Sequence, residues 1–376
     1  MIYFDNAATT SVHPEVARVY SRLVSEMYGN PDSLHQVGRQ AGANLETARR
    51  KIAEQLGITS RQIIFTSGGS EANSLATVGY VLANAHRGKH IITSNAEHSS
   101  TTNAMNWLES VGFEVERLPI GEKGYVSAEQ VKKALRKDTV LVSLIHVNNE
   151  TGAVTPISEI ADEVHKMPTT RLHCDLVQSF AKEDIDYSKL DLASMSAHKI
   201  HGLKGSGMLL KKPEIKLQPL IFGGQQEQGM RGGTENAPAD IVLAKTVRLA
   251  MENRPKAYRQ VQEINRYLRS ELAKIPGAHI HSPEDASPYI LNISFDSMTS
   301  EVLMSALDAR GICVSAKSTC ESHSGNESEI LRKMGKPTSV TTHAVRLAFS
   351  DTNTMDEARE FVSTVKEVLD RYGLPL

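Results

Sequence analysis

The chain has 376 residues, and a hydrophobic share of 40% is enough to form a sizeable core. Its 42 Lys and Arg residues nearly balance its 44 Asp and Glu residues, so the composition gives no reason to expect a nucleic-acid partner or a membrane partner. The N-terminus lacks the basic and apolar regions of a signal peptide, and three cysteines are no disulfide framework, so we expect a cytoplasmic protein.

Short β-branched runs alternate with helical patterns through the first two thirds of the chain. The predicted strands are residues 62–66, 90–94, 114–118, 139–147, 171–175, 192–197 and 207–210. Among the predicted helices are residues 71–85, 128–136 and 158–166. Strand–helix alternation of this kind predicts an α/β fold, whose large domain has a mainly parallel seven-stranded sheet covered by helices.

The pattern changes after a long, charged helical region that begins at Pro238 and ends near Lys274. Strands are predicted at residues 290–295, 312–316 and 345–349, and helices at residues 300–309 and 355–372. We therefore expect a smaller α+β domain that packs with the N-terminal segment. The predicted division is residues 15–255 for the large domain, and residues 1–14 with 256–376 for the small domain.

Lys199 follows an apolar strand and begins a loop that contains Gly202 and Gly205. A lysine at such a strand end can be partly removed from water, which lowers the pKa of its amine and makes the amine nucleophilic. A Schiff base with an aldehyde needs a lysine of this kind. For a single lysine, however, a plain surface position is the commoner explanation.

Two further segments lie where α/β sheets bind ligands. Asp175 ends an apolar strand, and it can either contact a ligand or cap a helix. Residues 67–70 lead from a strand through two glycines into a helix, where free N–H groups can hold a phosphate. This turn is also compatible with an ordinary capped βα connection, and it is not a Walker A loop.

Three more polar residues are candidates for ligand contacts. His98 lies in a loop, where it can stack on a ring or be an ordinary satisfied histidine. Asn149 follows a strongly apolar strand, and it can bind a ligand or form a turn with Gly152. Arg346 lies within an apolar strand and therefore needs an anion, either a substrate carboxylate or an internal Asp or Glu.

Cys320 is surrounded by polar residues from Ser318 to Ser328, which predicts an exposed loop suited to a moving nucleophile. Cys174 and Cys313 lie in apolar runs and are expected to be core residues. Cys320 with His323 offers only two ligands at a poor spacing, so we predict no metal site.

Taken together and in this order, these segments resemble the cysteine desulfurases of the NifS and IscS type in the class-V aminotransferase family. The resemblance rests on YFDNAATT (3–10), YGNP (28–31), FTSGGSE (65–71), AEH (96–98), VNNETG (147–152), SAHK (196–199) and MRGGT (230–234), together with Asp175 and Gln178. It covers nearly the whole chain. No single motif is decisive, but the ordered set is specific.

The resemblance implies a fold-type I enzyme that uses pyridoxal 5'-phosphate as a homodimer. It implies catalytic roles for Lys199 as the Schiff-base lysine, Cys320 as the sulfur acceptor and His98 as the residue stacked on the ring. It implies that Asp175 pairs with the pyridine nitrogen and that Arg346, with Asn149, binds the substrate. The remaining implied cofactor contacts are Asn149 and Gln178 beside the ring oxygen, Gly69, Ser70, Ser196 and His198 at the phosphate, and Thr234 at the phosphate of the neighbouring subunit.

The implied reaction converts L-cysteine to L-alanine and leaves a persulfide on Cys320, in a loop carried by the small domain. A sulfur-acceptor protein for iron–sulfur cluster assembly, tRNA thiolation or a thio-cofactor would then receive the sulfur. A selenocysteine lyase or an aminotransferase on the same fold is the nearest alternative, although transamination needs no thiol. A nucleotide-binding protein that uses the 67–70 turn is an alternative of a different class.

Overall fold

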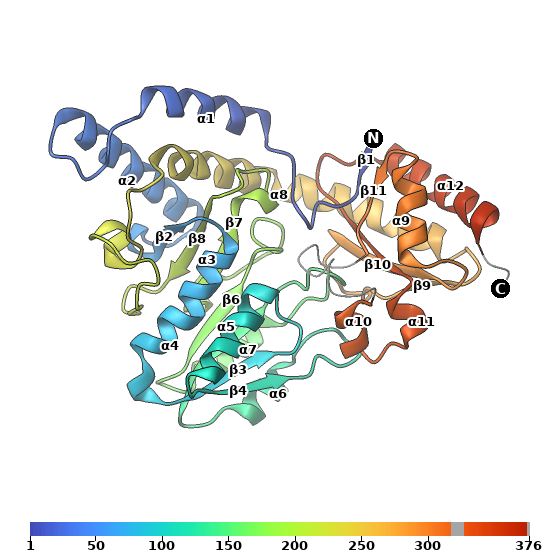
Figure 1. The fold of residues 1–376 in the computed structure, drawn as a ribbon, viewed down its shortest axis with the longest axis horizontal. Coiled ribbons are helices and arrows are strands. Elements are labelled where there is room, and N and C mark those ends of the chain that lie inside the picture. Colours follow the sequence, from blue (N-terminus) through green and yellow to red (C-terminus); the bar gives the residue numbers. More distant parts are fainter. Residues whose placement is uncertain (317–326, 374–376) are drawn as a thin grey trace.

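A sheet of seven strands forms the centre of the larger part of the molecule (Figure 1). The computed structural model describes residues 1–316 and 327–373. The sheet has the order β2-β8-β7-β6-β5-β3-β4, and β8 is antiparallel to both of its neighbours, whereas the other pairs are parallel. Its strands are β2 (Ile63–Thr66), β3 (His90–Ser94), β4 (Glu114–Leu118), β5 (Thr139–Ile145), β6 (Arg171–Asp175), β7 (Leu192–Ser196) and β8 (Gly207–Lys211). The predicted fold class is confirmed.

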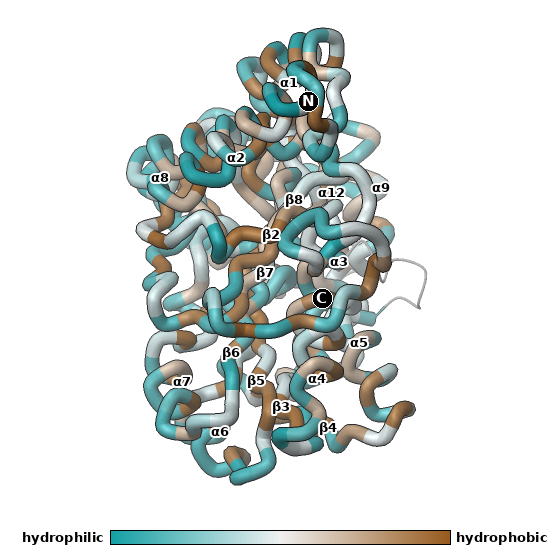
Figure 2. The backbone as a smooth tube through the Cα atoms, turned by 90° about the vertical axis from the view of Figure 1, so that its left-hand side faces the viewer, coloured by the Kyte–Doolittle hydropathy of each residue, from teal (hydrophilic) through white to brown (hydrophobic). Residues whose placement is uncertain are grey.

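The helices of this part lie on both faces of the sheet (Figure 1). They are α1 (Pro14–Glu26), α2 (Gln36–Leu56), α3 (Gly69–Ser74), α4 (Tyr80–Ala83), α5 (Ser99–Ser110), α6 (Ala128–Ala134) and α7 (Ile157–Val164). Every residue of β5 is buried, as expected of a central strand covered on both faces. Figure 2 shows hydrophobic residues concentrated along the strands, whereas the covering helices alternate between hydrophobic and hydrophilic residues.

Several element boundaries differ from the predictions. The predicted helix 71–85 begins two residues earlier, and a π-helical turn, Leu75–Gly79, separates α3 from α4. The predicted strand 312–316 is only two residues long in the structure, as β11 (Ile312–Cys313). Of the helices around the large sheet, α1, α2 and α5 were not predicted from the sequence.

The second part has a three-stranded antiparallel sheet, β12-β10-β9, and it lies beside the large sheet (Figure 1). Its elements are β9 (Ala278–Ile280), β10 (Ile290–Phe295), β12 (Ala344–Ala348), α9 (Ser300–Asp308), α10 (Glu329–Lys333), α11 (Thr338–Thr341) and α12 (Met355–Tyr372). The N-terminal strand β1 (Ile2–Tyr3) pairs in parallel with β11. The start of the chain therefore packs with its last third.

Helix α8 (Ala237–Leu272) connects the two parts and contains Pro255 in its interior. Leu243, Ala244 and Val247 of its first half join the apolar cluster around the large sheet. Residues from Val261 onward join a second cluster with Ile2, Phe4 and the strands of the smaller sheet. This distribution supports our proposal that the domains are residues 15–255 and residues 1–14 with 256–376.

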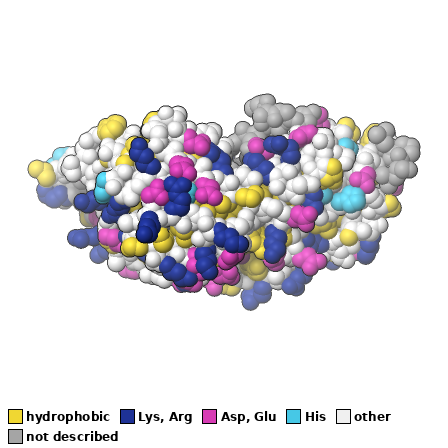
Figure 3. All heavy atoms as spheres, turned by 90° about the horizontal axis from the view of Figure 1, so that it is seen from below, with side chains coloured by type: hydrophobic (Ala, Val, Ile, Leu, Met, Phe, Trp, Pro, Cys, Tyr) yellow, Lys and Arg dark blue, Asp and Glu magenta, His cyan; other side chains and the backbone are white. Residues whose placement is uncertain are grey.

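Positive and negative side chains are interspersed on the face shown in Figure 3, as the balanced composition suggests. Among residues 1–316 and 327–373, none of the helices has the length and hydropathy that a membrane span requires.

Candidate active site

Asp175, Ser196, Lys199 and His98 lie at or just after the carboxyl ends of parallel strands, where open α/β sheets bind ligands. Asp175 is the last residue of β6, and Ser196 is the last residue of β7. Lys199 ends the single 3-10 turn, Ala197–Lys199, that follows β7. His98 caps the N-terminus of α5 after β3. Because these strands are parallel neighbours, residues that are up to a hundred positions apart in sequence meet at one edge.

One pocket of about 280 Å³ collects these residues. The predicted members that line it are Gly69, Ser70, His98, Asn149, Asp175, Gln178, Ser196, His198, Lys199 and Arg346. The sequence prediction missed Ala7, Ala8, Asn73, Ser100, Ile145 and Val177, which line the same pocket. The pattern Gly69 to Asn73 offered a signal for Asn73, because a residue one helical turn into α3 faces the same way as the turn itself.

Asn73 connects two of the predicted residues. Its Nδ2 donates hydrogen bonds to Asp175 Oδ2 at 2.7 Å and to Ser100 Oγ at 2.9 Å. Ser100 Oγ in turn lies 2.8 Å from His98 Nδ1. The other oxygen of Asp175 accepts the Val177 N–H at 2.9 Å. The carboxylate is therefore held in one orientation by bonds to both of its oxygens.

The turn before α3 adjoins a second hollow of about 310 Å³, which is lined by residues 67–71 with Ser196, His198 and Lys204. Glu71 accepts the Ser67 N–H at 2.8 Å, and Arg231 Nε donates to the same carboxylate at 3.0 Å. These bonds fix the turn and hold the pKa of Glu71 below its usual value, against the effect of burial. The first N–H groups of α3 and the Lys204 ammonium make the hollow suitable for an anion.

The N-terminal segment closes the pocket above Lys199. Lys199 Nζ donates hydrogen bonds to the carbonyl oxygens of Ala7 and Ala8, the latter at 2.7 Å. Gln178 Nε2 donates to the Ala7 oxygen at 3.0 Å. Gln178 Oε1 is buried and has no hydrogen-bond partner among the described residues. An unsatisfied buried oxygen in a pocket wall is a feature that a ligand donor would explain.

Arg346 is almost completely buried on β12, and the structure gives it an internal anion. Its Nη2 donates to Asp5 Oδ1 at 2.7 Å, and its Nη1 donates to the Asn149 carbonyl oxygen at 2.9 Å. Its buried Nε has no partner within residues 1–316 and 327–373. The sequence left two partners open for Arg346, a substrate carboxylate or an internal Asp or Glu. The structure contains the internal partner, Asp5, and Arg346 also lines the pocket.

Burial sets the charges of several groups around the pocket. Burial, together with the nearby charges of Lys199 and Lys204, lowers the pKa of His198 to about 4, so this imidazole is neutral at pH 7. Burial raises the pKa of Glu97 to about 8, so its carboxyl is mainly protonated at pH 7. Burial and the neighbouring Asp175 raise the pKa of the Cys174 thiol, which therefore is no thiolate.

One predicted residue that the structure describes does not line the pocket. Thr234 is exposed in the loop before α8, outside the pocket lining. Cys320 lies outside the described residues. Cys174 is fully buried, as predicted, but Cys313 is only partly buried, because β11 is a short strand paired on one side with β1. Neither of these two cysteines lines the pocket.

The fold and the site define a class of protein: residues 2–361 match the class-V aminotransferase family, and the chain belongs to that family. It is 41% identical to a NifS/IcsS protein homolog of Lactobacillus delbrueckii subsp. bulgaricus, over 99% of this chain and 98% of the relative. It is 36% identical to the cysteine desulfurase IscS of Methanosarcina thermophila, over 98% and 92%. A solved NifS-like protein has a TM-score of 0.92 at 33% identity, over 98% and 99%.

These comparisons confirm the resemblance and the fold-type I architecture, and the family's cofactor is pyridoxal phosphate. The residues present fit that group. The hollow at residues 67–71 has donors for a phosphate, and Asp175 offers an oriented carboxylate for a ring nitrogen. Lys199 offers an amine beside both. The unsatisfied Gln178 Oε1 offers an acceptor in the same wall.

Proposed function

We propose that this chain converts L-cysteine to L-alanine and passes the sulfur through Cys320 to an acceptor protein. The observation that carries the proposal is the single pocket in which Lys199, Asp175, His98 and Arg346 meet. The full-length relatives named cysteine desulfurase support the choice of reaction and of substrate.

Pyridoxal phosphate, when bound, supplies an aldehyde for the substrate amine and a ring that accepts electrons from the substrate. We propose that Lys199 Nζ, which the carbonyl groups of Ala7 and Ala8 orient here, binds that aldehyde and later moves the proton of the substrate α-carbon. Asp175 would hold the pyridine nitrogen in its protonated form, since its position is fixed by Asn73 and Val177. His98 would stack on the ring, with Ser100 and Asn73 fixing the imidazole.

The remaining contacts follow from the pocket walls. Gly69, Ser70, Ser196 and His198 would bind the phosphate, and Gln178 and Asn149 would face the ring oxygen. Arg346 has a free edge at Nε and would bind the substrate carboxylate beside its pair with Asp5. A neutral His198 suits its proposed contact with the phosphate, because it can donate one hydrogen bond without adding charge.

Cys320 is proposed as the sulfur acceptor because described residues on both sides of it adjoin the pocket wall. Ser315 pairs with Arg346 through two backbone hydrogen bonds, and Ser328 Oγ donates to Glu150 Oε2 at 2.7 Å. In the proposed step the substrate C–S bond breaks and a bond forms between the substrate sulfur and Cys320 Sγ. The hydrogen that the Cys320 thiol loses balances the hydrogen that the methyl group of alanine gains. The products are therefore L-alanine and a Cys320 persulfide.

We further propose a cytoplasmic homodimer in which Thr234 contacts the phosphate of the partner's site. Thr234 is exposed, and its loop is anchored to α3 by the contact between Arg231 and Glu71. The acceptor would be a protein of iron–sulfur cluster assembly, tRNA thiolation or a thio-cofactor pathway.

The test is to mix the pyridoxal-phosphate form with L-cysteine, measure L-alanine and map added sulfur by mass spectrometry. We expect one extra sulfur on the peptide that contains Cys320, and Cys320→Ser should bind L-cysteine but yield neither persulfide nor appreciable alanine. Cys174→Ser is the matched control and should remain active, since Cys174 lies in β6 away from the pocket surface. Sulfur found on Cys174 or Cys313 would refute the assignment, and transamination without sulfur release would favour an aminotransferase.

A further inference from the structure

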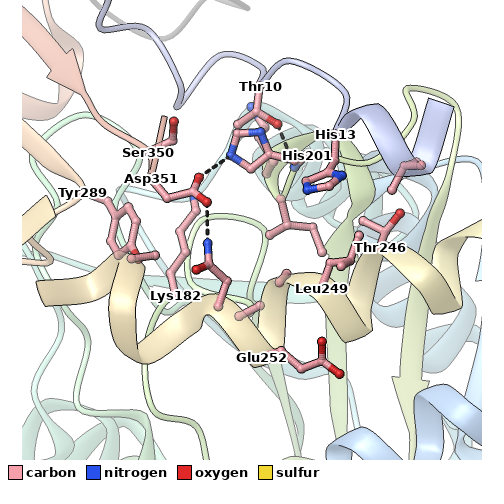
Figure 4. A pocket seen from close by; sticks show the side chains of 17 residues that line it. Thr10, His13, Lys182, His201, Thr246, Leu249, Glu252, Tyr289, Ser350 and Asp351 are labelled. Carbon is pink, nitrogen blue, oxygen red and sulfur yellow. Dashed lines mark hydrogen bonds and ion pairs between the residues drawn. The ribbon is translucent and has the colours of Figure 1, made fainter. Parts of the chain in front are cut away.

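A second cavity, of about 420 Å³, lies behind the active-site pocket between α1, α8 and the turn at Ser350 and Asp351 (Figure 4). Its polar lining includes His13, Lys182, His201, Tyr289 and Asp351. Lys199 lines both cavities, and the segment around Thr10 lies between them, since Thr10 bonds to His198 and His201. No residue proposed above for cofactor or substrate binding lines this second cavity, apart from Lys199.

Lys182 is a nearly buried cation in the wall of this cavity. Its residue is only 8% exposed, and its Nζ lies 5.4 Å from the centre of the Tyr289 ring. Among the described residues, no acceptor makes a hydrogen bond to this ammonium, and no carboxylate lies within ion-pair distance. Burial lowers the pKa of Lys182 to about 8, so the amine is still mainly charged at pH 7. Cations this deeply buried are normally paired.

The acidic groups near Lys182 already have partners. Asp351 Oδ1 lies 3.0 Å from His201 Nε2, and Asp351 Oδ2 accepts Asn253 Nδ2 (Figure 4). His201 Nδ1 faces the Ser11 carbonyl oxygen at 2.9 Å. Against the effect of burial, the charge of Asp351 raises the pKa of Lys182, but the hydrogen bonds of this carboxylate go to His201 and Asn253 and not to the ammonium.

The other two acids near the cavity are also engaged. Glu183 accepts the Ser287 hydroxyl, and burial raises the pKa of Glu183. Glu252 pairs with Arg248 at 2.9 Å on the outer surface of α8.

Further donors and an apolar wall surround the same space. His13 Nδ1 accepts the Glu15 N–H at 3.1 Å, so the neutral ring carries its proton on Nε2. The Tyr289 hydroxyl makes no hydrogen bond within the described part of the chain. The apolar wall is formed by Val16, Leu249, Ala250 and Ala257. A cation with apolar neighbours suits an anion that has a hydrocarbon body better than it suits inorganic phosphate.

We propose that this second cavity binds a small organic carboxylate, with Lys182 as its counterion. The short apolar wall accommodates a body of a few carbon atoms, and the Lys182 ammonium with the Tyr289 hydroxyl supplies donors for the carboxylate oxygens. The site is separate from the place where Arg346 would bind the substrate.

Titration calorimetry of the pyridoxal-phosphate form with sodium propionate tests the proposal, and inorganic phosphate serves as the comparison anion. We expect propionate to bind to the wild type, with a dissociation constant at least about tenfold higher in Lys182→Met, because the charged hydrogen bond is lost. Lys182→Arg should retain binding. The matched control is Lys256→Met, which removes an exposed cation from α8 near the cavity and should bind like the wild type.

Propionate binding at the Arg346 site would persist in Lys182→Met, so only the component lost in that variant belongs to this cavity. Unchanged binding in Lys182→Met, or no binding by the wild type, would overturn the proposal. Phosphate that binds more tightly than propionate in a Lys182-dependent manner would overturn the organic character of the ligand. If Lys182→Met does not fold, Lys182→Gln replaces it, and the same loss of propionate binding is expected.

Discussion

Replacing Asn73 with leucine tests whether the network beneath the proposed cofactor site matters for the reaction. Asn73 is 1% exposed, and its Nδ2 donates to the Asp175 carboxylate at 2.7 Å and to Ser100 at 2.9 Å. Leucine has a similar volume but no donor, so Asp175 would keep only the bond from the Val177 N–H. A hydrogen bond to a charged group contributes about 1.5–3 kcal/mol.

If that energy is used at the reacting site, kcat/KM for L-cysteine should fall by about 10- to 150-fold, at about 1.4 kcal/mol for each factor of ten. The free energy of unfolding should change by less than this hydrogen bond contributes, because leucine also removes Asn73 Oδ1, which is buried without a partner among the described residues. The assays are initial rates of alanine formation and the dissociation constant of pyridoxal phosphate.

Asn84→Leu is the matched control, since Asn84 is a buried asparagine that ends α4 and bonds to Tyr80 and Lys216, away from the pocket. It should lower the melting temperature without changing the rate of the folded enzyme. A rate within about threefold of wild type in Asn73→Leu would show that the network is only structural, because the smallest expected effect of the bond is about tenfold.

Three other predictions concern charged groups. Asp175→Asn should slow alanine formation by on the order of hundreds-fold, because a neutral amide cannot hold a ring nitrogen protonated, and a wild-type rate would make Asp175 a mere cap. Arg49→Met should destabilise the fold by about 3–5 kcal/mol in denaturant unfolding, because it leaves Glu227, which is 5% exposed, without its bidentate partner. The double variant Arg49→Met/Glu227→Leu should recover part of that loss. If the single and double variants have equal free energies of unfolding, the unpaired Glu227 carboxylate is not the cause of the loss. Burial raises the pKa of Glu97 to about 8 from an ordinary value of 4.5, so between these values the folded state holds more protons than the unfolded chain and stability falls as pH rises. Glu97→Gln should flatten that fall by up to about 1.4 kcal/mol per pH unit, and an unchanged slope in melting experiments from pH 5 to about 8 would count against a buried neutral Glu97.

The class of fold and most of the pocket were predictable from the sequence, because they depend on local order along the chain. Each strand of the large sheet has a run of β-branched residues, and parallel strands place the residues that follow them at one edge. The family resemblance assigned Lys199, Asp175, His98 and the 67–70 turn to one site, and the parallel strands explain why they meet there. Helices such as α2 and α5 were less evident, since their polar faces weaken the apolar period.

Contacts between distant segments were decided only by the tertiary structure. The pairing of Arg346 with Asp5 joins residues 341 positions apart, and the bond from Lys199 to Ala7 depends on the path of the N-terminal segment. The cavity around Lys182 likewise forms only where α1, α8 and the turn at Asp351 come together. Sequence periodicity determines which face of an element is buried, but the partner of a buried charge is set by packing between elements, and no local pattern encodes it.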